Sequence, residues 1–254
     1  MATDRSGTPL TWLALLLVGV GVADLGHSVR PVRWVPECLA AGVVVVLGLL
    51  AGLTDRVDVL AWLVIALVVI GWGRVVREGF GRDRPEWPLA LLGGAVLAAV
   101  LVSPLAGHVD GPLADWLQAL PWSRVAGAAP DTALLVLGGL LVQLSTGNVV
   151  VRLVLAATDT VNPSRPDREA SMRLKGGRLL GPMERLVIFG LGLGGHVTAA
   201  SLVIAAKALI RWPELQSFRD GGSDGPTIDE VTEYFLVGSF VSWLISLGTL
   251  AIVG

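Results

Sequence analysis

Long apolar runs alternate with short polar stretches along most of this 254-residue chain. A helix that crosses a bilayer needs about 20 mainly apolar residues. Seven runs come close to or exceed that length, and each predicts a transmembrane helix: Leu10–Val29, Val35–Leu53, Val57–Trp72, Trp87–Leu105, Thr132–Val151, Leu180–Ile210 and Val231–Val253. One such run would also fit a buried helix of a water-soluble core. Seven of them favour a membrane protein.

The expected fold is therefore an all-α, polytopic membrane helix bundle with about seven transmembrane helices. Composition agrees, because only 16% of the residues are charged, against about 25% in soluble domains. The polar stretches are too short to fold independently, so we expect residues 1–254 to form one integral membrane domain. Within it, 10–158 would form a five-helix N-terminal part and 170–254 a two-helix C-terminal part.

The basic residues predict the orientation, because cytoplasmic connections carry an excess of Lys and Arg. With seven spans, one side receives 13 of the 19 Lys and Arg residues. The other side receives Arg5, Arg56, Arg124, Lys207, Arg211 and Arg219. We therefore expect a multi-pass protein of the cell membrane (plasma or bacterial inner membrane), with the N-terminus outside and the C-terminus cytoplasmic.

Charge and cysteine content exclude several other classes. The net charge of −2 leaves no basic footprint for nucleic acid. The single cysteine, Cys38, allows no intramolecular disulfide, and no Cys/His group has zinc-binding spacing. We expect no cofactor. The lipid bilayer is the one predicted partner, and a protein partner or homo-oligomer stays open.

Two connections carry predictions of their own. Gly73–Glu86 is rich in arginine and is expected to be a cytoplasmic connection. In the external connection, Pro112–Leu120 has apolar residues at helical spacing. That spacing predicts a short helix at the membrane interface, where tryptophan side chains are enriched.

The C-terminal third carries three motifs in a recognisable order. They are G-R-L-L-G-P-M-E-R ending at Arg185, A-A-K ending at Lys207, and E-Y-F-L-V-G starting at Glu233. This succession resembles a family of uncharacterised bacterial polytopic membrane proteins, catalogued only as a domain of unknown function. Its pattern is G-R-L-[IL]-G-x-[LM]-E-R, then A-A-K, then E-Y-x-L-[IV]-G. The resemblance implies a membrane location and no established activity.

Charged residues inside predicted spans need an explanation, because each costs roughly 2.5–3.5 kcal/mol at a helix centre. Lys207 and Glu233 lie near the facing ends of the sixth and seventh spans, which we expect to be antiparallel neighbours, and they predict an ion pair. Asp24 and His27 lie three residues apart on one helix face. They are weak candidates for a metal site, and an interfacial hydrogen bond is the alternative.

The cytoplasmic start of the sixth span offers a candidate anion or lipid-headgroup site. Its residues are Lys175, Arg178, Glu184 and Arg185. Free N–H groups at a helix start, together with basic side chains, attract phosphate. The alternative is a helix cap plus a positively charged cytoplasmic anchor.

Small and polar residues recur on the last three predicted spans. Gln143, Asn148, His196 and Ser242 are the candidates for a shared polar face. Interhelical packing, with hydrogen bonds of about 0.6 kcal/mol each, is one interpretation of this face. A hydrated pocket or conduit is the other.

Three functions follow from these alternatives. The first is a non-enzymatic membrane module or regulator, with dry and fully paired polar faces. The second is a transporter or channel for a small solute or ion, with a water-accessible path past His196 and Gln143. The third is an intramembrane enzyme acting on a lipid, with Glu184, Asp24 and His27 converging. No catalytic residue is recognisable, so we favour the non-enzymatic interpretation.

Overall fold

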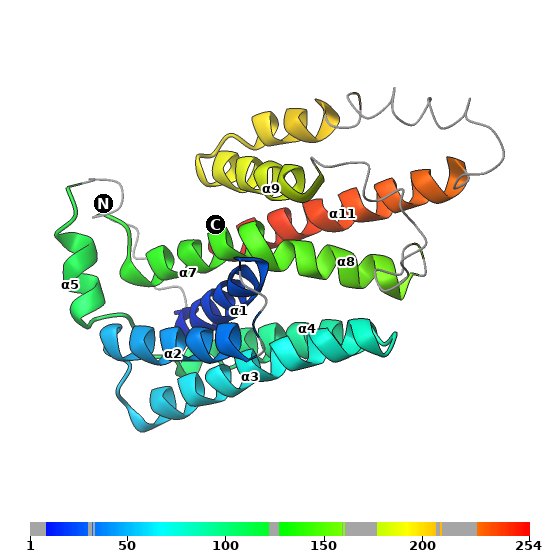
Figure 1. Cartoon of the computed structure of the whole chain (residues 1–254). Helices are drawn as coiled ribbons and strands as arrows, with labels where there is room; N and C mark the ends of the chain where they lie inside the picture. Colours follow the sequence, from blue (N-terminus) through cyan, green and yellow to red (C-terminus); the bar gives the residue numbers. More distant parts are fainter. Residues whose placement is uncertain are drawn as a thin grey trace. The chain divides into compact units, whose positions relative to one another are not determined.

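The structure is a computed structural model that describes residues 9–29, 32, 34–121, 127–158, 160, 177–206, 209 and 228–254, with backbone alone at 177–179 and 228–232. The predicted all-α fold is confirmed, since these residues form helices and no strand. The helices are α1 (Thr11–Val29), α2 (Val35–Leu50), α3 (Arg56–Gly81), α4 (Glu86–Leu101), the 3₁₀ turn η1 (Ser103–Leu105), α5 (Pro112–Gln118), α7 (Pro130–Leu141), the π-helical segment η2 (Val142–Thr146), α8 (Gly147–Ala157), α9 (Gly177–Leu193) and α11 (Ile228–Val253), as Figure 1 shows. A further helix runs over Val197–Ala206.

Four segments are long and apolar enough to cross a membrane. They are Thr11–Val29, Arg56–Gly81, Pro130–Ala157 and Glu233–Val253. Three apolar helices are shorter, namely Val35–Leu50, Glu86–Leu101 and Val197–Ala206. The predicted short helix after Pro112 is present as α5.

The third predicted helix is longer than its apolar run. We expected it to end at Trp72, but α3 continues to Gly81. Its last turns are polar, and Arg82 donates to Glu78 at 2.8 Å across one helical turn. Such a pair four residues apart supports a helix in water or at an interface. Hydropathy therefore located the apolar part of α3 and missed its polar extension.

The sixth predicted span is wrong as a single helix. α9 ends at Leu193, and a new helix begins at Val197. The N–H of His196 donates to the carbonyl of Leu191 at 2.8 Å, and the N–H of Gly195 donates to that of Gly192 at 2.9 Å. Together with the positive φ of Gly195 (77°), this is a Schellman motif, which ends a helix. The chain then turns back, and Figure 1 shows the two helices as a hairpin.

The described helices divide into two compact units. Unit 1 comprises Met1–Arg74 and Ala90–Val142, with Val253. Unit 2 comprises Val75–Leu89 and Gln143–Ile252, with Gly254. The α3–α4 turn therefore groups with the C-terminal helices, and the boundary after α7 falls within η2, between Val142 and Gln143.

Unit 1 is built around α1, which is buried along most of its length. Helix α1 packs against α2 and α7. A methyl group on Gly19 would lie 2.6 Å from a Val44 methyl and 2.7 Å from a Val69 methyl, so this glycine lets α2 and α3 approach α1. Gly138 of α7 has the same role beside Leu17. The core of unit 1 therefore depends on close helix approach at small residues.

Two tryptophan–aspartate hydrogen bonds join α1 to α3 in unit 1. The indole of Trp12 in α1 donates to Asp58 in α3 at 2.8 Å. The indole of Trp72 in α3 donates to Asp24 in α1 at 3.0 Å. The first bond joins the starts of the two helices, and the second joins positions further along both. Helices α1 and α3 therefore run parallel.

In unit 2, α9 and α11 also run parallel. Arg185 of α9 contacts Ser242 of α11, and a methyl group on Gly192 of α9 would meet the side chain of Leu250. We expected the last two spans to be antiparallel neighbours, and that expectation is wrong for α9 because the Schellman motif reverses the chain before α11. Lys207 lies outside the described residues and Glu233 is exposed, so their ion pair stays a prediction.

Replacing Trp12 by Phe keeps the ring and removes the donor to Asp58. Asp58 is 5% exposed, so losing this bond should destabilise the protein by about 1–2 kcal/mol. The check is the thermal unfolding midpoint in detergent, which should fall for Trp12→Phe. Trp116 is 60% exposed, and Trp116→Phe is the matched control. Equal midpoints for both variants would contradict a structural role for the Trp12–Asp58 bond.

Candidate functional site

The most buried cation of the described chain lies in unit 2. Arg185 of α9 is 1% exposed. Its Nε donates to the backbone carbonyl of Gln143 at 3.1 Å, and its two terminal nitrogens donate to Ser242 Oγ at 3.1 Å and Asn148 Oδ1 at 2.7 Å. All three acceptors are neutral oxygens, and they come from η2, α8 and α11. A guanidinium has five donors in a fixed planar fork, so one side chain can bind three helical segments at once.

The local sequence of η2 and α8 makes room for this guanidinium. The π-helical turn at Val142–Thr146 shifts backbone carbonyls out of the regular α-helical pattern, and Arg185 binds one of them. Gly147 follows directly, and a methyl group there would lie 2.6 Å from Arg185 Nε. Because glycine has no side chain, the guanidinium can lie against the start of α8 at Gly147.

Three of the four candidates for a shared polar face meet at Arg185. Gln143, Asn148 and Ser242 all bind it. Ser246 extends the network, since its hydroxyl donates to Gln143 Oε1 at 3.1 Å. We call Gln143, Asn148, Arg185, Ser242 and Ser246 the arginine cluster.

The fourth candidate, His196, does not belong to the arginine cluster. It was expected near the middle of a continuous sixth helix. The structure places it at the hairpin turn after α9, where it is exposed. The Gly194-Gly195 sequence before it was the available signal, because glycine commonly ends a helix.

The candidate headgroup site at the start of the sixth span needs a correction at Arg185. That side chain is buried in the arginine cluster, so it does not face a ligand outside the helices. Glu184 is half-buried. Lys175 lies outside the described residues, and so does the side chain of Arg178, so their part of that site stays a prediction.

Asp24 and His27 bind different partners in unit 1. Asp24 accepts from Trp72, whereas His27 Nε2 lies 2.8 Å from Glu37 Oε1. Within the described ranges, no group of three His, Cys, Asp or Glu residues has the placement of a metal site. The hydrogen-bonded alternative is the one that the geometry favours.

Sequence reasoning missed two buried acids, Glu37 and Asp58. Glu37 is 0% exposed and lies in the first turn of α2, next to Pro36. In the sequence it looks like an ordinary first-turn acid. Asp58 occupies the same position in α3 and binds both Trp12 and the N–H of Gly107, the latter at 3.1 Å. An acid in a first turn is common, so neither position stood out. Only the approach of other helices makes them buried.

Two buried polar atoms near the arginine cluster have no hydrogen-bond partner among the described residues. They are Gln143 Nε2 and Thr146 Oγ1. Both belong to η2, and the side chains are 0% and 2% exposed. A buried donor without a partner costs about 1–3 kcal/mol, and a buried water commonly satisfies such groups.

Comparison with protein-family models, with curated proteins and with solved structures found no match to this chain. The resemblance of the C-terminal third to uncharacterised bacterial membrane proteins stays a prediction.

Gly147→Ala tests the arginine cluster directly. The added methyl group would overlap the guanidinium of Arg185 and should destabilise the protein by about 1–3 kcal/mol, which is typical of an overpacked core. Gly190→Ala in α9 is the matched control, because a methyl group there meets nothing within 4 Å. The check is the amount of monodisperse protein that remains after heating in detergent. A Gly147→Ala protein as heat-stable as Gly190→Ala would contradict the tight packing.

Proposed function

We propose that this chain is a multi-pass protein of the cell membrane that acts as a non-enzymatic membrane module or regulator. The observation that carries the proposal is the arginine cluster. Its polar groups bind one another across helices and so hold η2, α8, α9 and α11 together. Polar groups that form hydrogen bonds between helices are typical of a structural bundle.

The membrane placement rests on the apolar helices and on the position of Arg185. An arginine in lipid is tolerated where it faces the bundle interior and binds backbone carbonyls. Arg185 meets both conditions through Gln143 and α11. The same residue on a lipid-facing surface would need to reach the membrane interface.

The helix directions support a revised topology with six crossings (α1, α2, α3, α4, α7–α8 and α11) and a hairpin of α9 with Val197–Ala206. α11 runs parallel to α9, so both end on the side opposite the α8–α9 connection. We therefore propose that the C-terminus lies outside, on the same side as the N-terminus. The C-terminus lies on this side both for a hairpin that enters the membrane partly and for one that crosses it twice.

Charge favours the revised topology. Lys207, Arg211 and Arg219 change sides, so the cytoplasmic share rises from 13 to 16 of the 19 basic residues. Three basic residues then lie outside, namely Arg5, Arg56 and Arg124. The asymmetry that the positive-inside rule describes becomes stronger.

Reporter fusions after Gly254 distinguish the two topologies. An external C-terminus should give active alkaline phosphatase and a dark green fluorescent protein in a bacterial host, because each reporter folds on one side only. Fusions in the basic α3–α4 turn, at Gly81, should give the opposite result and serve as the control. A fluorescent, phosphatase-inactive fusion at Gly254 would restore the seven-span topology.

A transporter or channel for a small solute or ion is the second candidate. It is favoured by the buried polar atoms Gln143 Nε2 and Thr146 Oγ1, which have no partner in the described chain. Donors of this kind would suit a hydrated cavity beside η2.

Cysteine labelling separates the two candidate functions. The background is Cys38→Ala, since Cys38 is exposed. In a dry module, Gln143→Cys and Ser242→Cys should resist a polar, membrane-impermeant maleimide. The exposed control Trp116→Cys should react. Reaction at both cluster positions, in a protein that still elutes as one species, would reject the dry module and favour transport.

A further inference from the structure

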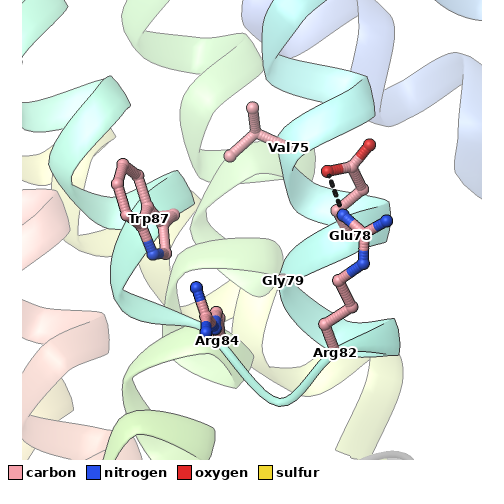
Figure 2. Close-up of a pocket in the computed structure, with 6 residues that line it drawn as sticks. All are labelled: Val75, Glu78, Gly79, Arg82, Arg84 and Trp87. Carbon is pink, nitrogen blue, oxygen red and sulfur yellow. Dashed lines mark hydrogen bonds and ion pairs between the residues drawn. The ribbon is translucent and has the colours of Figure 1, made fainter.

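The turn between α3 and α4 lines a half-open cavity of about 180 Å³ in unit 2. Its lining residues are Val75, Glu78, Gly79, Arg82, Arg84 and Trp87. Figure 2 shows Arg84 and Trp87 along one wall and the Glu78–Arg82 pair along the other. The cavity shares no residue with the arginine cluster, and neither proposed function uses it.

The backbone of this turn fixes the two walls. The N–H of Arg84 donates to the carbonyl of Gly79 at 2.9 Å, and Asp83 has a positive φ of 56°. This geometry ends α3 sharply. A methyl group on Gly79 would lie 2.9 Å from Pro88, so glycine lets the start of α4 pack against α3.

The two arginines of the cavity differ in their partners. Arg82 binds Glu78 at 2.8 Å and its charge is matched there. Arg84 is exposed, and none of the described residues forms an ion pair with it. The cavity therefore has one uncompensated guanidinium, whose planar fork suits a phosphate.

The apolar wall and its depth define the ligand further. Trp87 is 61% exposed beside Arg84. In α3 the twenty residues from Val57 to Val76 span about 30 Å, which matches the hydrocarbon thickness. Glu78, Arg84 and Trp87 then lie at headgroup level, where an exposed indole is favourable. A soluble anion would gain nothing from Trp87, whereas a lipid would.

We propose that this α3–α4 cavity binds the phosphate headgroup of an anionic lipid, with Arg84 on the phosphate and Trp87 against the glycerol and upper acyl chain. The inference rests on the proposed membrane placement of α3. The proposed role as a module or regulator does not require this site.

The test compares lipids retained by the full-length protein. Nanodiscs hold equal amounts of phosphatidylglycerol and phosphatidylcholine, and native mass spectrometry counts the lipids that stay bound. The wild type should retain phosphatidylglycerol preferentially. Arg84→Gln should lower that preference about fivefold, the factor that corresponds to about 1 kcal/mol for one basic residue at an anionic surface.

The matched control is the double variant Glu78→Gln, Arg82→Gln, which removes the ion pair from the opposite wall and leaves the net charge of the turn unchanged. It should keep the preference. An unchanged preference in Arg84→Gln, or an equal loss in the control, would overturn the site, because the guanidinium of Arg84 would then not be the group that selects the lipid. Displacement of the lipid by millimolar glycerol phosphate would assign the cavity to a soluble anion and overturn the lipid assignment.

A second measurement does not depend on the folding of Arg84→Gln. Brominated phosphatidylglycerol should quench the tryptophan fluorescence of the wild type more than brominated phosphatidylcholine, and Trp87→Phe should reduce that difference. Equal quenching by both lipids would also overturn the site. Flotation with vesicles of phosphatidylcholine alone tests the membrane placement separately. Protein that fails to float refutes the membrane placement. Protein that floats but shows no lipid preference in the nanodisc and quenching measurements refutes only the site.

Discussion

The burial of one guanidinium determines how the C-terminal helices can pack. Arg185 is removed from solvent, and an arginine in that position is tolerable only while its N–H groups stay bonded. Its acceptors come from η2, α8 and α11, so no two of these segments can separate without stranding a donor. The π-helical turn and Gly147 both meet this requirement, since the turn presents a carbonyl to the guanidinium and Gly147 lacks the side chain that would block it.

Unit 1 solves the same problem with the opposite charge. Its buried side chains include three carboxylates, Asp24, Glu37 and Asp58, and an indole or imidazole nitrogen lies within hydrogen-bond distance of each. Trp12 and Trp72 bind Asp58 and Asp24, and His27 binds Glu37. A tryptophan donates one hydrogen bond and is otherwise apolar, so it can bind an acid inside an apolar bundle while its rings fill the space between helices. The pairing also fixes the parallel direction of α1 and α3, because one bond joins the starts of the two helices and the other joins positions further along both.

Hydropathy predicted the helical class and most helix positions, because apolar run length is a local property of the sequence. The starts of α1, α2 and α4 agree with the expected runs within a residue. The failures have one cause in common, which is that the decisive interaction is not apolar. α3 continues past Trp72 through polar residues that pair with each other, and the expected sixth helix breaks at Gly195, inside a run whose hydropathy stays high. Among the site residues, the polar stripe at Gln143, Asn148 and Ser242 could be predicted from spacing. The identity of the residue at its centre could not, because Arg185 reads as an interfacial anchor until the parallel packing of α9 and α11 is known.

That parallel packing follows from a hairpin that the hydropathy of the sequence does not reveal. A hydropathy profile counts apolar runs, so a hairpin whose two arms are both apolar is counted as one long span. In the topology that we propose, this difference of one crossing moves everything after the hairpin, including Lys207, Arg211 and Arg219, to the other side of the membrane. The basic residues hold the information needed to detect it. The seven-span topology would leave six of them outside, and the proposed topology with a hairpin would leave three. Charge asymmetry is therefore more than a guide to orientation here. Because each basic residue resists translocation, the proposed hairpin topology, with its larger cytoplasmic share, is the one that the positive-inside rule favours.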